Sequence, residues 1–228
     1  MTGALVGVMG AAGAGKSTVA AGLVDRWGFR RVRLADGIKR MLRALDVGDE
    51  HVDGSRKLDP HPLLCGRSAR HALQTLGTEW GRRLIGEDVW VLQLVAAVET
   101  ARALDPDARI VVDDVRFPNE TAAIRRLGGT LALVRRPEAE PAGAAWRIPL
   151  ARRLPEGLAG LLGLPHPSEH GWWTLRGEAD VTLPNGLGLA GLRRQVDALA
   201  YNRLGLRPPP LTLDAAAFLR GGRSADGP

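Results

Sequence analysis

Residues 10–17 have the composition and spacing of a loop that binds phosphate. They read Gly-Ala-Ala-Gly-Ala-Gly-Lys-Ser, which is a glycine, four residues and then Gly-Lys-Ser. Glycine lets a backbone wrap closely around an anion with its N–H groups pointing inward. In such a P-loop Lys16 can bridge the β- and γ-phosphates of ATP, and the Ser17 hydroxyl can bind Mg²⁺. The expected ATP-binding residues are Ala12, Gly13, Ala14, Gly15, Lys16, Ser17 and Thr18.

Acidic residues stand where a second apolar strand is expected to end. Asp113 and Asp114 directly follow the predicted strand 109–112, which reads Arg-Ile-Val-Val. In proteins with a P-loop, an acidic residue at this place helps to hold Mg²⁺ or its waters. The alternative interpretation is a solvent-exposed strand end without a role in chemistry.

Asp36 follows another short predicted strand, Phe29–Leu34, and should lie over the same edge of the sheet. Its carboxylate could accept a hydrogen bond from a substrate hydroxyl, or it could orient Lys39 three residues later. Capping of the helix that begins near Ile38 is an equally good interpretation of this spacing.

Four polar residues are spaced four apart in a segment whose apolar spacing predicts a helix over 68–85. Arg70, Gln74, Thr78 and Arg82 should form one stripe, with the apolar residues on the other side of the helix. Arginine makes bidentate contacts to phosphate, and glutamine can read the edge of a base. The stripe therefore suits a nucleotide, with a solvated helix face as the alternative.

Lysine is rare in this arginine-rich chain, where it occurs at Lys16, Lys39 and Lys57 alone. Lysine is a compact, mobile point charge, whereas arginine is a planar fork. Because one of the three lysines belongs to the P-loop, Lys39 and Lys57 are candidates for phosphate contact.

The segment 135–171 is long for a simple connection and is rich in Pro, Gly, Ala and Arg, so we expect a lid insertion there. The basic residues of this lid are Arg147, Arg152 and Arg153. His166, Glu169 and His170 are of metal-ligating types, but the flexible Pro-rich setting and the lack of a cysteine partner argue against a structural metal.

Composition limits the classes of protein that the chain can belong to. The 228 residues are 45% hydrophobic and contain no apolar run near the ~20 residues of a membrane span, so we expect a soluble, cytoplasmic protein. With Cys65 as its single cysteine, the chain cannot form an internal disulfide. The formal net charge is +6, but aromatic content is 4% and the arginines are dispersed. Small phosphorylated ligands explain this charge as well as nucleic acid does.

Alternating strand and helix patterns predict an α/β fold with a mainly parallel sheet of about five strands and helices on both faces. Strands are expected at 5–9, 29–34, 109–112, 130–134 and 180–183, and further helices at 19–27, 38–45, 89–104, 119–127 and 189–204. Asp88 and Asn119 are expected to cap two of these helices. The expected arrangement is a kinase-type domain over residues 1–205, with an acceptor region at 36–90, the lid at 135–171 and a loosely ordered tail at 206–228.

In this order the segments resemble the bacteriophage deoxynucleoside monophosphate kinases, a branch of the P-loop nucleotide kinases with a three-layer fold. The resemblance covers about residues 4–204. Besides the P-loop, it rests on the segments 35–39, 68–82, 88–90, 114–120, 128–129, 166–169 and 180–185. The Leu-Gln-x-x-Gly-Thr, Arg-Phe-Pro-Asn-Glu and Pro-Ser-Glu sequences within them are the most specific.

The resemblance implies transfer of the γ-phosphoryl group of ATP to a deoxynucleoside monophosphate, with Mg²⁺ held by Ser17 and Asp114 directly or through water. Asp114 is favoured over Asp113 because the recurrent Asp of the family directly precedes Val-Arg-Phe. The implied catalytic residues are Lys16, Asp114 and Arg116. The implied acceptor-binding residues are Asp36, Lys39, Arg70, Gln74, Thr78, Arg82, Trp90, Arg116, Ser168 and Glu169. The lid arginines would close over the phosphates.

Two other functions are compatible with the same motifs. One is another small-molecule P-loop kinase, such as a dephospho-coenzyme A kinase or an animal-type phosphomevalonate kinase. The other is a nucleic-acid-binding NTPase, although no helix-turn-helix pattern is present. We expect ATP and a deoxynucleoside monophosphate as ligands, with no membrane and no nucleic acid as partners. The sequence leaves a homodimer open, and the compartment would be the host cytoplasm if the protein is phage-encoded.

Overall fold

Five parallel strands form the single sheet that organises the computed structural model, which describes residues 3–140 and 167–207 and positions 148, 150, 153, 161, 162 and 164 between them. The strands are β1 (Leu5–Met9), β2 (Arg30–Val32), β3 (Ile110–Val112), β4 (Thr130–Arg135) and β5 (Val181–Pro184). Their order is β2-β3-β1-β4-β5, and every neighbouring pair is parallel. The predicted five-stranded α/β fold is confirmed, and the P-loop leaves the sheet from its central strand.

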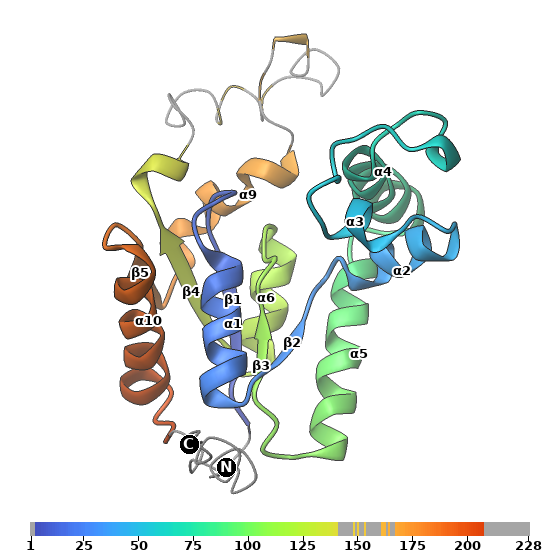
Figure 1. The fold of residues 1–228 in the computed structure, drawn as a ribbon. Coiled ribbons are helices and arrows are strands. Elements are labelled where there is room, and N and C mark those ends of the chain that lie inside the picture. The colour runs from blue at the N-terminus through green and yellow to red at the C-terminus, as the bar shows by residue number, and fades with distance from the viewer. Residues whose placement is uncertain are drawn as a thin grey trace, which may run out of the picture.

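Helices cover both faces of this sheet (Figure 1). The helices α1 (Lys16–Trp27) and α10 (Gly188–Ala198) pack together on one face, whereas α5 (Val89–Leu104), α6 (Pro118–Arg126) and α9 (Pro167–Leu175) are neighbours on the other. A π-helical turn, η5 (Leu199–Arg203), extends α10. Short 3₁₀ turns are η1 (Pro62–Leu64), η3 (Pro137–Ala139) and η4 (Arg176–Glu178). None of the helices in the described part of the chain has the length and apolar character needed to cross a membrane.

Residues 36–85 form an arm that stands to the right of the sheet in Figure 1. It contains α2 (Asp36–Ala44), α3 (Asp49–Val52), α4 (Ala69–Thr75) and the π-helix η2 (Leu76–Ile85). The arm has a small apolar cluster of its own, in which Leu42, Val47, Val52 and Ala69 are buried. Leu73 and Leu76 pack against this cluster and also against the main core, so they join the arm to the sheet.

The arm is also where the structure differs most from the sequence-based expectation. The helix expected over 68–85 is an α-helix only as far as Thr75 and then continues as a π-helix. The segment 46–66, expected as a loop, contains α3 and η1. Asp88 is the N-cap residue of α5, as predicted, although its side chain makes no capping hydrogen bond. The predicted cap at Asn119 is wrong, because Pro118 occupies the first helical position of α6 and Phe117 the N-cap.

Candidate functional site

The P-loop joins β1 to α1, as the motif predicts. Gly15, the residue before α1, has a φ of 105°, which side chains with a Cβ rarely adopt. A Cβ there would also lie 2.6 Å from Nδ2 of Asn185, which donates a hydrogen bond of 2.8 Å to the carbonyl of Ala14. The residue that follows β5 therefore braces the loop, and glycine is the residue that fits between them.

Lys16 lies folded against its own loop. Its Nζ donates hydrogen bonds to the carbonyls of Gly10, at 2.9 Å, and Ala11, at 2.7 Å. Lys16, Ser17 and Gly13 border one end of a cavity of about 980 Å³. The loop therefore presents its lysine and its hydroxyl to this cavity.

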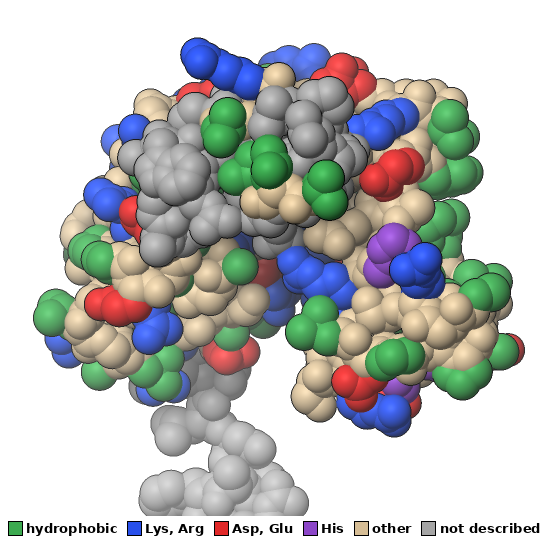
Figure 2. Space-filling model, turned by 90° about the horizontal axis from the view of Figure 1, so that it is seen from above, with side chains coloured by type: hydrophobic (Ala, Val, Ile, Leu, Met, Phe, Trp, Pro, Cys, Tyr) green, Lys and Arg blue, Asp and Glu red, His purple; other side chains and the backbone are tan. Residues whose placement is uncertain are grey.

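The cavity extends from the P-loop to the arm and is strongly basic. Among the described residues that line it, nine are Lys or Arg and five are Asp or Glu. Seen from above, basic side chains gather where the arm meets the rest of the molecule (Figure 2). The basic lining residues are Lys16, Arg31, Arg33, Lys39, Arg43, Lys57, Arg70, Arg82 and Arg116, and the acidic ones are Asp49, Asp53, Asp113, Asp114 and Glu120. Such a surplus of positive charge suits a ligand that carries several negative charges.

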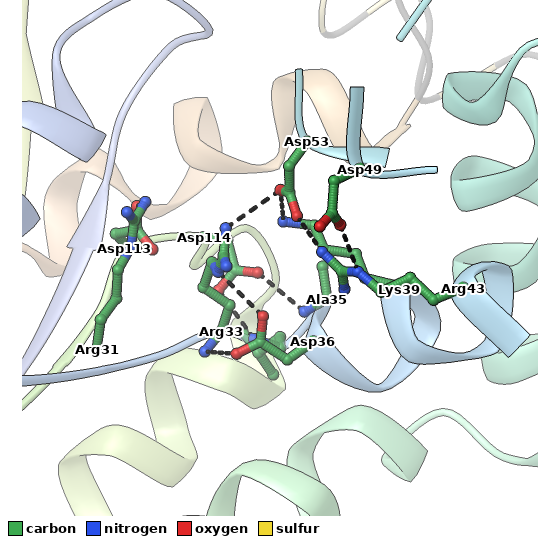
Figure 3. Close-up of polar contacts among 11 residues, drawn as sticks. Arg31, Arg33, Ala35, Asp36, Lys39, Arg43, Asp49, Asp53, Asp113 and Asp114 are labelled. Atoms are coloured by element: carbon green, nitrogen blue, oxygen red, sulfur yellow. Dashed lines mark hydrogen bonds and ion pairs between the residues drawn. The ribbon is translucent and has the colours of Figure 1, made fainter. Parts of the chain in front are cut away.

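The two aspartates after β3 have different partners. Asp113 is 4% exposed and forms a two-point ion pair with Arg31, whose Nε lies 3.0 Å from Oδ1. Asp114 accepts hydrogen bonds from the backbone N–H groups of Leu34, at 3.0 Å, and Ala35, at 2.9 Å (Figure 3). Burial raises the pKa of Asp114, although these two donors act in the opposite direction. Asp114 thus fixes the turn between β2 and α2 while it borders the cavity.

Asp36 does not have the position that the sequence suggested. Its carboxylate turns back to Arg33, accepting from the backbone N–H at 3.0 Å and pairing with Nε at 3.0 Å, and it is not among the residues that line the cavity (Figure 3). The interpretation that Asp36 orients Lys39 is wrong, because Nζ of Lys39 bonds to Asp53 instead, at 2.6 Å. Ala35, not Asp36, is the N-cap of α2.

Asp53 is the centre of an ionic cluster on the arm that sequence reasoning missed. Besides Lys39, it pairs with Arg43 at 2.7 Å and Arg33 at 3.4 Å, and Arg43 also pairs with Asp49 at 2.7 Å. Burial alone would raise the pKa of Asp53, but the hydrogen bond and charge of Lys39, aided by the arginines, outweigh burial and lower it. These partners are 6 to 20 residues apart in the chain, so no local motif marks them.

The polar stripe does reach the cavity, since Arg70, Gln74, Thr78 and Arg82 all line it. A spacing of four overshoots one turn of an α-helix, which has about 3.6 residues per turn, and falls short of one turn of the wider π-helix. The change of winding at Leu76 therefore keeps the four side chains in line, where a continuous α-helix would have carried Arg82 around to another face.

Arg82 is held by several contacts at the floor of the cavity. Its guanidinium pairs with Glu120 at 2.5 Å, donates to the carbonyl of Glu87 at 3.0 Å and lies 4.0 Å from the ring centre of Phe117. Asn119 contributes a further acceptor at 3.4 Å. The segments 68–82 and 114–120, on which the resemblance rests in part, therefore meet at Arg82. Arg82 holds the floor of the cavity together, and it also offers a positive charge to a ligand.

Glu120 is the buried acid of this group, and it is not among the site residues predicted from the sequence. It is 3% exposed, and its second oxygen accepts from the N–H groups of Arg116, at 2.6 Å, and Phe117, at 3.0 Å. Burial raises its pKa from 4.5 to about 7, against the lowering effect of Arg82. Its place three residues after an N-cap is a capping signal that could have drawn attention to it.

Trp90 supports the site from below. It is 3% exposed, its Nε1 donates to the carbonyl of Gly77 at 2.8 Å, and a Cβ on Gly81 would collide with its ring. Its only donor is bonded to η2, so the indole helps to hold the π-helix. Because Trp90 also borders the cavity, its role in binding a base or sugar stays a prediction.

The remaining predicted residues divide between the cavity and the segment outside the described residues. Arg116 lines the cavity, and its carbonyl is close to Gly171 of α9. Arg147 and Arg152 lie outside the described residues, as do the side chains of Ser168 and Glu169, whereas Arg153 is helical and exposed. Within the part of the chain that the structure describes, no three His, Cys, Asp or Glu side chains form a metal site.

Comparison with known proteins gives two relatives whose names agree with one another. No protein-family model matches the chain. It is 32% identical over 143 residues to the deoxynucleotide monophosphate kinase of Acanthamoeba polyphaga mimivirus, a match that covers 58% of this chain and 74% of that protein. Over 58 residues it is 41% identical to the deoxynucleoside-5′-monophosphate kinase of Escherichia phage T5, covering 25% of this chain and 22% of that protein.

Solved structures resemble the chain more distantly. Dephospho-CoA kinase from Campylobacter jejuni has a TM-score of 0.45 at 13% identity, over 87% of this chain and 96% of that chain. Shikimate kinase from Acinetobacter baumannii, solved with shikimate, has a TM-score of 0.42 at 14% identity, over 90% of this chain and 94% of that chain.

Proposed function

The chain belongs to the deoxynucleotide monophosphate kinases, P-loop phosphotransferases of viruses and phages, and on that premise we propose its reaction. It transfers the γ-phosphoryl group of ATP to a deoxynucleoside 5′-monophosphate and releases ADP and the diphosphate. One observation carries the proposal: a single cavity is bordered by Lys16 and Ser17 of the P-loop at one end and by the polar stripe of the arm at the other. Donor and acceptor phosphates can therefore meet in one shared cavity.

The residues around the cavity suit the chemistry of this transfer. A phosphate monoester is largely dianionic at neutral pH, because its second pKa is near 6, so the acceptor needs no strong general base. The difficulty is to hold two anions in line and to exclude water. In this proposal Lys16 exchanges the carbonyls of its own loop for the donor phosphates. Arg116 and Arg70 balance the charge that builds up where the two phosphates meet.

The oxygen donors at the P-loop end fit a magnesium ion. Mg²⁺ prefers oxygen ligands and is usually held by one or two protein groups together with substrate phosphates and water. Ser17 and Asp114 both border the cavity, and each Asp114 oxygen accepts one backbone N–H, which leaves a lone pair on each. When bound there, the ion would neutralise charge on the transferred phosphoryl group.

We assign recognition of the acceptor to the region 36–90 and closure to the lid at 135–171 of a kinase domain that spans residues 1–205. Gln74 and Thr78 have the donors and acceptors that a base and a sugar require, and both border the cavity. Roles for Ser168 and Glu169, and for the lid arginines 147, 152 and 153, stay predictions from the sequence.

An acceptor panel with ATP and Mg²⁺ tests the reaction. It contains the four deoxynucleoside and four ribonucleoside monophosphates, together with dephospho-coenzyme A and phosphomevalonate. Formation of a nucleoside diphosphate from at least one deoxynucleotide is expected, with ADP released in equal amount. Phosphorylation of dephospho-coenzyme A or phosphomevalonate, and of no nucleotide, would overturn the proposal.

A further inference from the structure

Lys57 is a basic residue of the cavity wall to which the site described above gives no role. Its side chain is half-buried and borders the cavity. Lys16 bonds to its own loop and Lys39 to Asp53, but within residues 3–140 and 167–207 no hydrogen bond or ion pair of the Lys57 ammonium is found. Its charge therefore faces the cavity without a carboxylate of its own.

The backbone fixes Lys57 beside the start of the polar stripe. Its carbonyl accepts a hydrogen bond of 3.0 Å from the N–H of Arg70, in the first turn of α4. A β-bridge between Pro60 and Ser68 closes the intervening loop over that helix start. A lysine and an arginine from different parts of the arm are thus held next to one another at the cavity.

The surroundings of Lys57 are repulsive for its charge. Burial is the largest cause that lowers its pKa, and the charge of Lys39 comes next, with Arg70 and Arg116 acting in the same direction. Asp53 opposes them, but this carboxylate also pairs with Lys39, Arg33 and Arg43. Half-buried like charges destabilise the folded protein unless an anion joins them. A group with two negative charges would complement such a place.

We propose that Lys57, held beside Arg70, binds the phosphate of the acceptor nucleotide and selects its dianionic form. This inference rests on the proposed function and adds to it a residue and a subsite. A mobile ammonium on the arm can follow the acceptor phosphate as it approaches the P-loop, whereas a planar guanidinium needs a fixed geometry. The loop 53–68 would then serve acceptor binding and not merely connect α3 to α4.

The proposal makes stability and acceptor binding change in opposite directions. Removal of the Lys57 charge should leave the unliganded protein as stable as before or more stable, because a repulsive charge is removed. The same removal should weaken binding of the acceptor. If Lys57 had a merely structural role, its removal would lower the stability of the protein and would raise the KM of both substrates.

The test compares Lys57→Gln and Lys57→Arg in the full chain with the control Arg67→Gln. Arg67 is exposed on the same loop and does not line the cavity, so the control removes one positive charge from nearby surface. The measurements are KM for a deoxynucleoside monophosphate, KM for ATP, calorimetric binding of the monophosphate alone, and the thermal unfolding midpoint. Lys57→Gln should raise the acceptor KM and Kd about tenfold, the loss expected for one charge-assisted contact. The KM for ATP should not rise and the unfolding midpoint should not fall. Lys57→Arg should restore part of the affinity for the acceptor.

An unchanged acceptor KM in Lys57→Gln, with an active wild-type protein, would overturn this inference and leave the proposed function standing. A lower midpoint with both KM values raised would show a structural role and would overturn it as well. If the wild-type protein phosphorylates no nucleotide, the proposed function fails, and the inference fails with it.

Discussion

The two ends of the cavity are built in different ways. At the P-loop end, one short segment supplies the loop backbone, Lys16 and Ser17, and the central strand and Asn185 hold it in place. At the arm end, the charged side chains come from α2, α3, α4 and the loop between them, over a small apolar cluster of four buried residues. The first end depends on local backbone geometry, and the second depends on contacts between distant parts of the chain.

This difference predicts which substitutions should change the kinetics of one substrate and leave those of the other unchanged. A change in the P-loop removes a contact to the donor phosphates, which every turnover uses whatever the acceptor is. A change on the arm should alter the acceptor kinetics and leave ATP binding as it was. Four substitutions at the two ends test that division, and they follow in order from the largest expected effect to the smallest.

Lys16→Ala should lower kcat by roughly 10²–10³-fold, the loss typical of one preorganised electrostatic contact to the reacting group. The fold should be retained, because the hydrogen bonds that Nζ of Lys16 donates to the carbonyls of Gly10 and Ala11 lie within its own loop. Steady-state kinetics with several deoxynucleotides and a thermal melt measure both effects. Wild-type turnover, or a loss confined to one acceptor, would contradict the assigned role of the P-loop.

Arg70→Ala should lower kcat/KM for the acceptor by roughly 10- to 100-fold while ATP KM stays the same, because it removes a charge-assisted interaction that belongs to the arm. His71→Ala is the matched control, since His71 is the next residue of α4 and is exposed away from the cavity. An equal rise of both KM values would show that the ends of the cavity are not separable.

Glu120→Gln tests whether a buried charge holds the floor of the arm end. The folded pKa of about 7 lies above the usual 4.5, so the folded protein binds the proton more tightly than the unfolded chain does. The stabilising contribution is complete below pH 4.5 and is lost as pH rises through about 7. Across that range the wild-type protein should lose on the order of 3 kcal/mol of unfolding free energy relative to Glu120→Gln.

Urea unfolding at about pH 4.5, 6 and 8 measures this difference, since these values lie at the lower limit of the range of the shift, within it and above it. Glu87→Gln is the control, because Glu87 is exposed and only its backbone carbonyl accepts from Arg82. Its stability should follow the wild-type protein at every pH. If the stability of Glu120→Gln followed that of the wild-type protein at every pH, Arg82 would keep Glu120 ionised throughout the range.

The same division explains how far the sequence could predict the molecule. The succession of β1, P-loop and α1 follows from glycine positions and apolar runs, which are local signals. The stripe Arg70 to Arg82 was predicted from spacing, although the π-helix that aligns it was not. Lys39 with Asp53 and Arg82 with Glu120 join residues 14 and 38 positions apart, so only the folded chain reveals them. Asp36 shows the reverse case, because an acidic residue at the right strand end can still turn to a neighbouring arginine.

The smallest expected effect concerns Asp36, and it tests directly whether this carboxylate stays turned to Arg33 and away from the cavity. Asp36→Asn should change the acceptor KM by less than about twofold and the unfolding free energy by at most about 1 kcal/mol, since partly exposed ion pairs contribute little. Asp53→Asn should lower the unfolding midpoint more, because Lys39, Arg33 and Arg43 would lose a shared counter-charge. Acceptor kinetics and thermal melts of both variants make the comparison. A rise of about tenfold in acceptor KM for Asp36→Asn at unchanged stability would mean that Asp36 turns into the cavity when the acceptor binds. At the arm, as at the P-loop, a residue that follows a strand would then reach the cavity because of its position in the sequence. The two ends of the cavity would differ less in construction than the unliganded contacts indicate.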